Sequence, residues 1–140
     1  MVCCFLGHKE APERVRDELY KTISSLVEEG VLSFLVGNQG GFDNMVLSVL
    51  RNLKTIYPEI DYQIVLAYMP QNKDASYPYY SWETCYPEGL ELVPPRFAIS
   101  QRNRWMIQKS DIVICFVTHT WGGAAQFVDL AYKKRKRLIA

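Results

Sequence analysis

Short apolar runs alternate along this chain with longer segments whose apolar residues recur at helical spacing. The apolar runs have the length of β-strands and occupy residues 2–6, 31–36, 62–68 and 111–117, with a last one from Arg137. The segments with helical spacing cover residues 12–29, the stretch from Asp43 to Pro58, 98–109 and 124–134. This alternation predicts an α/β fold with a doubly wound parallel sheet and helices on both faces. Counted from the N-terminus, the five strands are expected in the order 3-2-1-4-5.

The same spacing predicts which helical side chains face the core. Asp43 is expected to cap the second helix. The inward residues of the second and third helices are expected to be Val46, Val49, Leu50, Leu53, Ile99, Trp105 and Met106. Residues 69–95 show no sustained period, so they are expected to form a long loop with a short helix near 81–86.

Three of the predicted strands end in glycine and polar residues directly before a helix. Gly7-His8 follows the first strand, the turn from Gly37 to Asp43 follows the second, and residues 118–123 follow the fourth. In an open parallel sheet these turns lie along the carboxyl edge, where ligands bind at the reversal of winding direction. We therefore expect a ligand between the 7–8 turn and the 118–123 turn, with residues 37–43 closing one side.

The glycine-rich turns fit two interpretations. Backbone N–H groups of the 37–43 turn can bind a phosphate or ribose, and Asp43 can accept a hydrogen bond from a ribose hydroxyl. Alternatively, the glycines serve only the geometry of the turn and Asp43 caps the helix. Trp121 can stack on a base or pack at a strand–helix turn. The chain matches neither GxGxxG nor GxxxxGK[ST], so it has neither a dinucleotide fingerprint nor a Walker A loop.

Charged and titratable residues also leave alternatives open. Arg102 lies one helical turn before Met106 and hence on the inner side of its helix, where it needs a carboxylate or a ligand phosphate. His8 and His119 can bind phosphate, take part in acid–base chemistry, or be ordinary loop residues. The basic run 133–137 falls at a predicted helix C-terminus, where cations are favourable, so it does not indicate a nucleic-acid patch.

Composition narrows the class of protein. The 140 residues suit a single domain, 1–140, and the net charge of +1 does not attract nucleic acid or a membrane. No apolar stretch approaches the roughly 20 residues of a membrane helix. The four cysteines form no CxxC pair, which argues against a zinc ribbon and favours a reducing cytoplasm. No cluster of His, Asp or Glu residues has the spacing of metal ligands, and no metal or cofactor is expected.

Adjacent Cys3 and Cys4 should point to opposite faces of the first strand.

Taken in order, these motifs resemble the SLOG superfamily, the Rossmann-like group that joins the Smf/DprA proteins to the LOG-type nucleotide hydrolases. The likeness is greatest to its small, single-domain YpsA-like branch. The residues that carry it are Cys4-Phe5-Leu6-Gly7-His8-Lys9, the Gly37 turn with Asp43, Tyr57-Pro58 and the next strand with Gln71, Arg102-Asn103-Arg104-Trp105-Met106, Ser110-Asp111, and Gly122-Gly123 leading to Ala131 and Lys133.

The resemblance implies binding of nucleotides or nucleotide-derived signals at the carboxyl edge of the sheet. Some branches cleave the base from a nucleoside monophosphate, and others bind single-stranded DNA. This chain departs from the hydrolase pattern at two positions: Ala124 replaces a threonine, and Phe127 replaces the glutamate that stabilises positive charge on the ribose. Those departures argue against hydrolysis by the usual route.

The residues and the resemblance together predict a cytoplasmic, bacterial or phage domain that senses or sequesters a nucleotide or nucleotide derivative. The expected ligand-binding residues are Gly7, His8, Gly37, Asn38, Gly40, Gly41, Asp43, Gln71, Arg102, His119, Trp121, Gly122 and Gly123. One alternative is a nucleotide N-glycosidase of the LOG phosphoribohydrolase type. Another is a DprA-like binder of single-stranded DNA, which would need a continuous basic groove. Nucleic acid and membranes are not expected partners, and a homodimer is left open.

Overall fold

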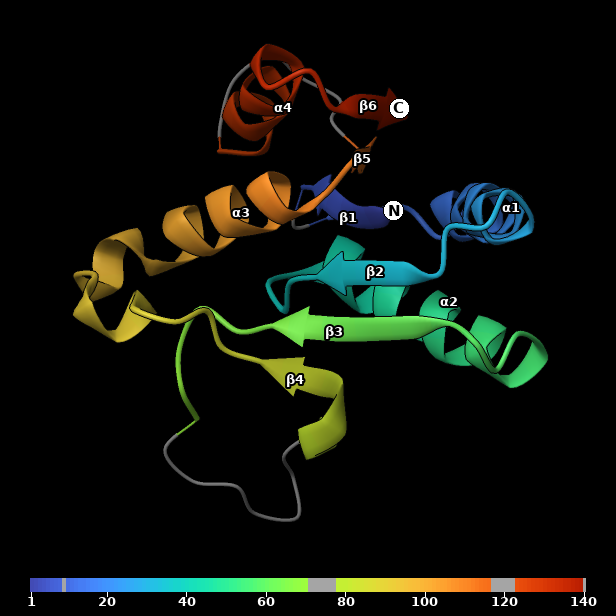
Figure 1. Ribbon diagram of the computed structural model, residues 1–140, viewed down its shortest axis with the longest axis horizontal. Coiled ribbons are helices and arrows are strands. Elements are labelled where there is room, and N and C mark those ends of the chain that lie inside the picture. The colour runs from blue at the N-terminus through green and yellow to red at the C-terminus, as the bar shows by residue number, and fades with distance from the viewer. Residues whose placement is uncertain (9, 71–77, 117–122, 140) are drawn as a thin grey trace.

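The computed structural model describes residues 1–8, 10–70, 78–116 and 123–139 (Figure 1). In this part of the chain, a parallel six-stranded sheet has the order β4-β3-β2-β1-β5-β6. Its strands are β1 (Val2–Gly7), β2 (Ser33–Val36), β3 (Asp61–Val65), β4 (Thr84–Cys85), β5 (Ile112–Phe116) and β6 (Arg137–Ile139). The α/β class is confirmed, and the five predicted strands stand in the predicted order. The short strand β4, which was not predicted, extends the sheet beyond β3.

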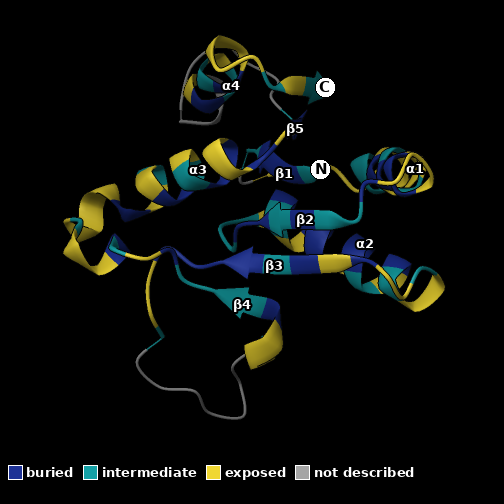
Figure 2. Cartoon of the chain, in the orientation of Figure 1, coloured by how far each residue is buried: buried dark blue, intermediate teal, exposed yellow. Residues whose placement is uncertain are grey.

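Helices cover both faces of the sheet. Helices α1 (Val15–Glu28) and α2 (Gly41–Ile56) bury their apolar sides on one face, and α3 (Ala98–Lys109) and α4 (Gly123–Lys133) on the other. Cys3 belongs to the core beneath α1 and α2, whereas Cys4 belongs to the core beneath α3 and α4. This confirms the alternation expected for β1, and Figure 2 shows buried residues along the strands. None of the described helices is both long and apolar enough to cross a bilayer.

Helix α2 begins three residues earlier than an N-cap at Asp43 would place it. Gly40 takes the N-cap position at φ 95°, a backbone conformation that favours glycine, and Gly41 is the first helical residue. Asp43 therefore lies inside the first turn, and the expectation that it would be the N-cap is wrong. Its Oδ2 instead accepts a hydrogen bond of 2.9 Å from the backbone N–H of Gln39 and so closes the β2–α2 turn. The predicted inner residues of α2 are buried: Val46, Val49, Leu50 and Leu53.

Helix α3 has the predicted bounds, but one of its inner residues differs. Arg102 and Met106 are buried as expected, and Trp105 is half-buried against the core beneath α3 and α4. Ile99 lies on the same face of α3 as Arg102 and Met106 but is 36% exposed, so the expectation that it packs into the core is wrong. It borders an open cavity beside the first turn of α3 instead of packing into the core.

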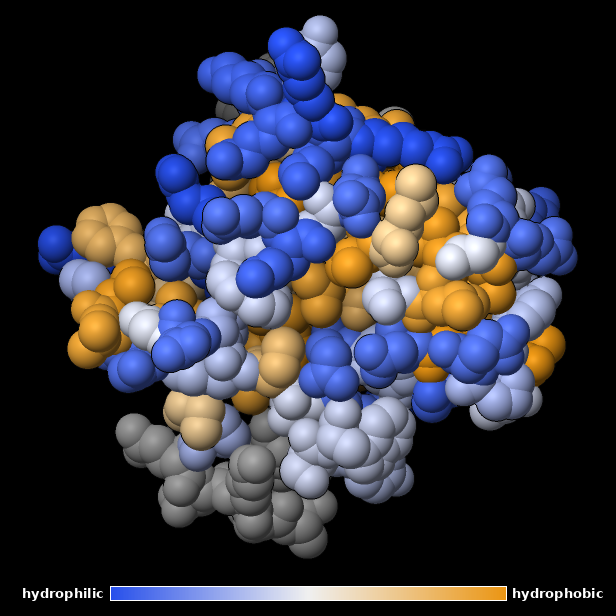
Figure 3. All heavy atoms as spheres, in the orientation of Figure 1, coloured by the Kyte–Doolittle hydropathy of each residue, from blue (hydrophilic) through white to orange (hydrophobic). Residues whose placement is uncertain are grey.

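The corner that leads into α3 consists of two 3₁₀ helices, η2 (Leu90–Leu92) and η3 (Pro95–Phe97). Leu92 and Phe97 are exposed here, and Figure 3 shows apolar atoms gathered at this corner on the left of the view. The Arg96 guanidinium lies 4.8 Å from the centre of the Phe97 ring. This contact covers part of the apolar surface and holds Arg96 beside the start of α3.

A buried carboxylate fixes the segment that contains β4. Within the stretch expected to be a loop, η1 (Ser81–Glu83) is the short helix expected near 81–86, and β4 follows it at once. The Glu83 oxygens accept hydrogen bonds from Arg51 Nε and Nη2 at 2.8 and 2.7 Å, from the Tyr62 hydroxyl at 2.6 Å and from the Tyr80 N–H at 3.1 Å. Glu83 thus ties η1 to α2 and β3, which places β4 in register with β3.

Candidate functional site

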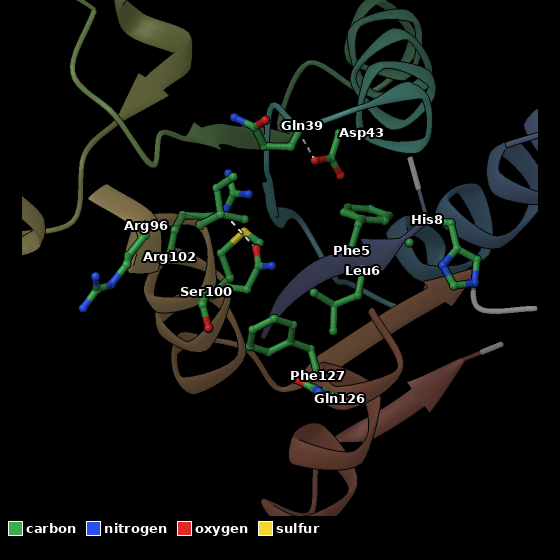
Figure 4. A pocket seen from close by; sticks show the side chains of 14 residues that line it. Phe5, Leu6, His8, Gln39, Asp43, Arg96, Ser100, Arg102, Gln126 and Phe127 are labelled. Atoms are coloured by element: carbon green, nitrogen blue, oxygen red, sulfur yellow. Dashed lines mark hydrogen bonds between the residues drawn. The ribbon is translucent and has the colours of Figure 1, made fainter. Parts of the chain in front are cut away.

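A cavity of about 500 Å³ opens at the carboxyl end of β1, bordered by the start of α2 and by α3 and α4 (Figure 4). Its volume lies within the range of roughly 300–1,000 Å³ that is usual for small-molecule sites. The residues that line it are Phe5, Leu6, Gly7, His8, Gln39, Asp43, Arg96, Ile99, Ser100, Arg102, Asn103, Met106, Gln126 and Phe127. The carboxyl edge of the sheet was the expected place for a ligand.

Arg102 brings a buried positive charge to this cavity. Its side chain is 1% exposed and donates to the Val65 carbonyl at 2.9 Å, to Asn103 Oδ1 at 2.8 Å and to Asn38 Oδ1 at 3.4 Å. Burial lowers the pKa of Arg102, and the negative charge of Asp43 opposes that shift. No described carboxylate lies within ion-pair distance of the guanidinium. The guanidinium is therefore hydrogen-bonded only to neutral oxygens, and Asp43 attracts it at longer range, so an anion in the cavity can still pair with it directly.

Asp43 brings a titratable carboxyl group to the same cavity. Burial raises the pKa of Asp43 to about 6, although the hydrogen bond from Gln39 and the positive charge of Arg102 counteract this rise. Asp43 can therefore change its protonation state just below neutral pH. Figure 4 shows Asp43 and Gln39 above the cavity and Arg102 beside them on α3.

Gly37 explains how Arg102 and Asp43 come close together. A Cβ at position 37 would lie 2.8 Å from Arg102 Nη1 and 2.8 Å from Asp43 Oδ2. Both side chains thus pack against the bare backbone of Gly37, which lies behind them and not on the cavity wall. Asn38 likewise acts as a hydrogen-bond partner of Arg102 and does not line the cavity. Their expected role as direct ligand contacts has no support in this geometry.

Gly7 and His8 lie where the sequence places them. A Cβ at Gly7 would come within 2.3 Å of the Phe42 ring, so the absence of a side chain lets α2 pack against the end of β1. The His8 N–H donates to the Phe116 carbonyl at 3.3 Å, and its ring meets the Phe116 ring edge-on at 6.2 Å. Pairing of Gly7 with Phe116 confirms that the first and fourth predicted strands are neighbours.

Four predicted site residues, Gln71, His119, Trp121 and Gly122, lie outside the described residues. Gly123 is the first residue of α4, and Gly40 and Gly41 begin α2. In the part of the chain that the structure describes, no group of three or more His, Cys, Asp or Glu side chains could hold a metal ion.

Several cavity residues were not predicted from the sequence as ligand contacts. Ile99, Asn103 and Met106 share with Arg102 one face of α3 at helical spacing, so the inward position of Arg102 could have indicated Asn103. Arg96 in η3, Ser100 in the first turn of α3 and Gln126 on α4 give no such signal. Phe127 is 8% exposed and lines the cavity.

Comparison with solved structures shows that the fold is shared with DprA proteins. DNA processing protein A from Streptococcus pneumoniae superposes with a TM-score of 0.70 and 14% identity, over 97% of this chain and 48% of that one. DNA processing protein A from Helicobacter pylori, whose structure concerns its single-stranded DNA binding mode, gives a TM-score of 0.62 and 17% identity, over 99% of this chain and 63% of that one. This chain therefore spans less than two thirds of either protein. At such identities the likeness shows the fold alone.

Sequence comparison identifies the family. No curated protein matches the chain significantly. The model of the YpsA family, described as the YspA SLOG family, matches residues 2–80, which is more than half of the chain. Because this match includes β1, the β2–α2 turn with Asp43, and β3, it covers one side of the cavity. The chain belongs to the YpsA family of SLOG proteins.

Proposed function

We propose that the chain binds a nucleotide or nucleotide derivative in the cavity and holds its phosphate beside Arg102. The observation that carries this proposal is a buried guanidinium on the cavity wall that has no carboxylate partner among the described residues. The first turn of α2 lies on the same side and leaves backbone N–H groups without helical acceptors. Both features favour an anion, and the helix terminus alone contributes roughly 0.3–1 kcal/mol.

The other walls suit the remainder of a nucleotide. Phe5, Leu6 and Phe127 form an apolar side against which a base or sugar can pack. Asp43 has an oxygen free of Gln39 that can accept a hydrogen bond from a ribose hydroxyl. With no glutamate at position 127, the binding of a ligand without turnover fits a sensing or sequestering domain.

The test is titration calorimetry with AMP, GMP, CMP and UMP, and with the matching nucleosides as controls. We expect at least one nucleotide to bind at least about tenfold more tightly than its nucleoside, since a charge-assisted hydrogen bond contributes about 1.5–3 kcal/mol. Native mass spectrometry of the purified protein identifies any copurified nucleotide and extends the panel. Equal affinity for nucleotide and nucleoside would contradict a phosphate site at Arg102.

Asp43 gives this binding a predicted pH dependence. If the ionised carboxylate accepts from the ribose, the bound state favours ionised Asp43, so affinity falls as pH drops through about 6. Between pH 7 and pH 5 the loss should be about tenfold. The matched variant is Asp43→Asn, which keeps the shape and cannot titrate. Because the ligand phosphate also titrates near this pH, the difference between the two proteins isolates Asp43. Affinity that rises towards acid pH in the wild type alone would instead place Asp43 against the phosphate.

An N-glycosidase is the second candidate function, because the Asp43 carboxyl group lies in the cavity with a pKa of about 6. We nevertheless predict no release of free base from AMP beyond one turnover per protein. The resemblance to the hydrolase branch puts Phe127 where that branch has its glutamate, and Asp43 is held by Gln39 at the other side of the cavity. Chromatographic detection of adenine over many turnovers would overturn this prediction. Loss of that activity in Asp43→Asn would then identify Asp43 as the acid.

A DprA-like role in binding single-stranded DNA is the third candidate. The Helicobacter pylori neighbour supports it through a shared fold. The net charge of +1 does not favour it, because binding to nucleic acid depends on neutralising several phosphates at once.

A further inference from the structure

A second, smaller hollow continues the cavity along the outside of the molecule. It measures about 190 Å³ and lies between α3 and α4. Ser100, Gln126 and Phe127 line both the cavity and this groove, so the two hollows are direct neighbours that share these residues as a common wall. Beyond these three residues the groove is lined by Arg104, Asp129, Leu130 and Lys133. A ligand longer than a mononucleotide can therefore extend from the cavity into the groove.

The groove carries one uncompensated positive charge. Lys133 Nζ lies 3.0 Å from Asp129 Oδ2, so these two charges offset each other. Arg104 is exposed and makes no ion pair with any residue that the structure describes. The hydroxyl of Ser100 and the amide of Gln126 lie on the same lining and can donate hydrogen bonds. This combination suits a phosphate group.

Arg102 and Arg104 cannot serve the same phosphate. Side chains two positions apart in an α-helix are rotated by about 200° around the helix axis, so they lie on nearly opposite sides. Arg102 accordingly faces the core side of α3, and Arg104 faces solvent and the groove. Two anion sites on opposite sides of α3 require a ligand with two separate phosphates.

Phe127 lies at the junction of the two hollows. A glutamate at this position would add a negative charge between the two phosphates and oppose both. The neutral ring removes that repulsion and offers an apolar surface to a base or sugar that crosses from the cavity to the groove. A neutral side chain at this junction thus favours a ligand with two phosphates.

We propose that the groove between α3 and α4 binds a second phosphate of the ligand, which is then a dinucleotide carrying a terminal phosphate and a phosphodiester. The proposal rests on the proposed function, because the first phosphate occupies the Arg102 site. Such a unit can come from a free dinucleotide or from the end of a single strand of nucleic acid. We assign the free dinucleotide, because Arg104 supplies a single charge and the groove contains no further uncompensated cation among its described residues.

The test compares 5′-phosphorylated dinucleotides of adenosine, guanosine, cytidine and uridine with the four mononucleotides by calorimetry. At least one dinucleotide should bind about tenfold more tightly than its mononucleotide. Arg104→Ala should remove that gain and leave mononucleotide affinity unchanged. Lys134→Ala removes an equal charge next to Lys133 but outside the groove, and it should preserve the gain.

Four outcomes would overturn the assignment, and they are distinguishable. If mononucleotides bind but no dinucleotide binds more tightly, the groove site is overturned and the proposed function stays intact. The same holds if Arg104→Ala weakens the binding of mononucleotide and dinucleotide equally. Absence of binding by every probe overturns both. A 5′-phosphorylated ten-residue oligodeoxyadenylate should bind no more tightly than the adenosine dinucleotide. Tenfold tighter binding of the oligonucleotide would overturn the assignment in favour of single-stranded nucleic acid.

Discussion

Arg102→Met is expected to weaken the binding of a phosphate-bearing nucleotide by about a hundredfold. Methionine keeps most of the buried volume but removes every donor, and two charge-assisted hydrogen bonds of about 1.5–3 kcal/mol each account for at least that loss. Calorimetry with the best-binding mononucleotide measures the effect. Affinity for the corresponding nucleoside should stay unchanged, because the nucleoside has no phosphate.

The stability of the same variant separates a ligand-binding role from a structural one. Removing the guanidinium deprives the Val65 carbonyl of its donor, but it also removes a poorly solvated charge that forms no direct ion pair and is attracted only at longer range by Asp43. These effects oppose each other, so the free energy of unfolding should change by no more than about 1–2 kcal/mol. Arg137→Met is the matched control, because Arg137 forms a surface pair with Glu29 at 3.4 Å, away from the cavity. If Arg102→Met lost much more free energy of unfolding than this limit while nucleotide binding stayed unchanged, Arg102 would have a structural role in the core alone.

The inward position of Arg102 could be predicted because residues close to it in sequence determine which side of its helix it occupies. Helical spacing places it one turn from Met106, and the prolines at 94 and 95 and the strand from Ile112 bound the helix on either side. The sequence left open whether its partner would be a carboxylate or a ligand. The structure excludes a direct ion pair among the described residues, because the nearest partners are the oxygens of Val65, Asn38 and Asn103.

The role of Gly37 and the extension of the cavity could not be predicted, because both depend on contacts distant in sequence. Gly37 meets Arg102 from 65 positions away, and no local pattern distinguishes that contact from an anion-binding turn. The groove depends on how α3 and α4 pack together, so no local pattern indicates that Ser100, Arg104 and Gln126 line it. Phe127 is the exception, because the resemblance marks its position.

Strand β4 was missed for a similar reason. Two residues are too short to show an alternating pattern, and the flanking prolines at 78 and 87 indicate a loop. What forms the strand is the Glu83 network, whose partners Arg51 and Tyr62 lie 32 and 21 positions away. The conformation of this edge of the sheet is therefore a tertiary effect.

Glu83→Gln is accordingly expected to have the largest effect on stability. The amide replaces one of the two acceptor oxygens with a donor, so the paired hydrogen bonds from Arg51 cannot both form. At a side chain that is 1% exposed, the negative charge that pairs with Arg51 is also lost. Breaking a fully buried pair costs about 3–5 kcal/mol. Because Arg51 keeps contact with water, we expect a loss of about 2–4 kcal/mol in the free energy of unfolding. Denaturant unfolding at pH 7 measures it.

Glu13→Gln is the matched control for that measurement. Glu13 pairs with Arg16 at 2.6 Å, but its side chain is 78% exposed, so the change should cost less than about 1 kcal/mol. Similar losses in the two variants would show that burial adds nothing to the Glu83 pair.

The pH dependence of stability gives a second measure of the same network. Burial alone would raise the pKa of Glu83, but hydrogen bonds from Arg51, Tyr62 and the Tyr80 N–H outweigh it and hold the pKa below its usual value. A carboxylate whose pKa is lowered by folding contributes stability above its unfolded pKa and loses it as pH falls through the folded value. The wild type should therefore lose stability as pH falls below about 4.5, and Glu83→Gln should lack this component. Parallel acid profiles for the two proteins would mean that Glu83 is not held ionised by Arg51, and the network could not then be what fixes β4 at the edge of the sheet.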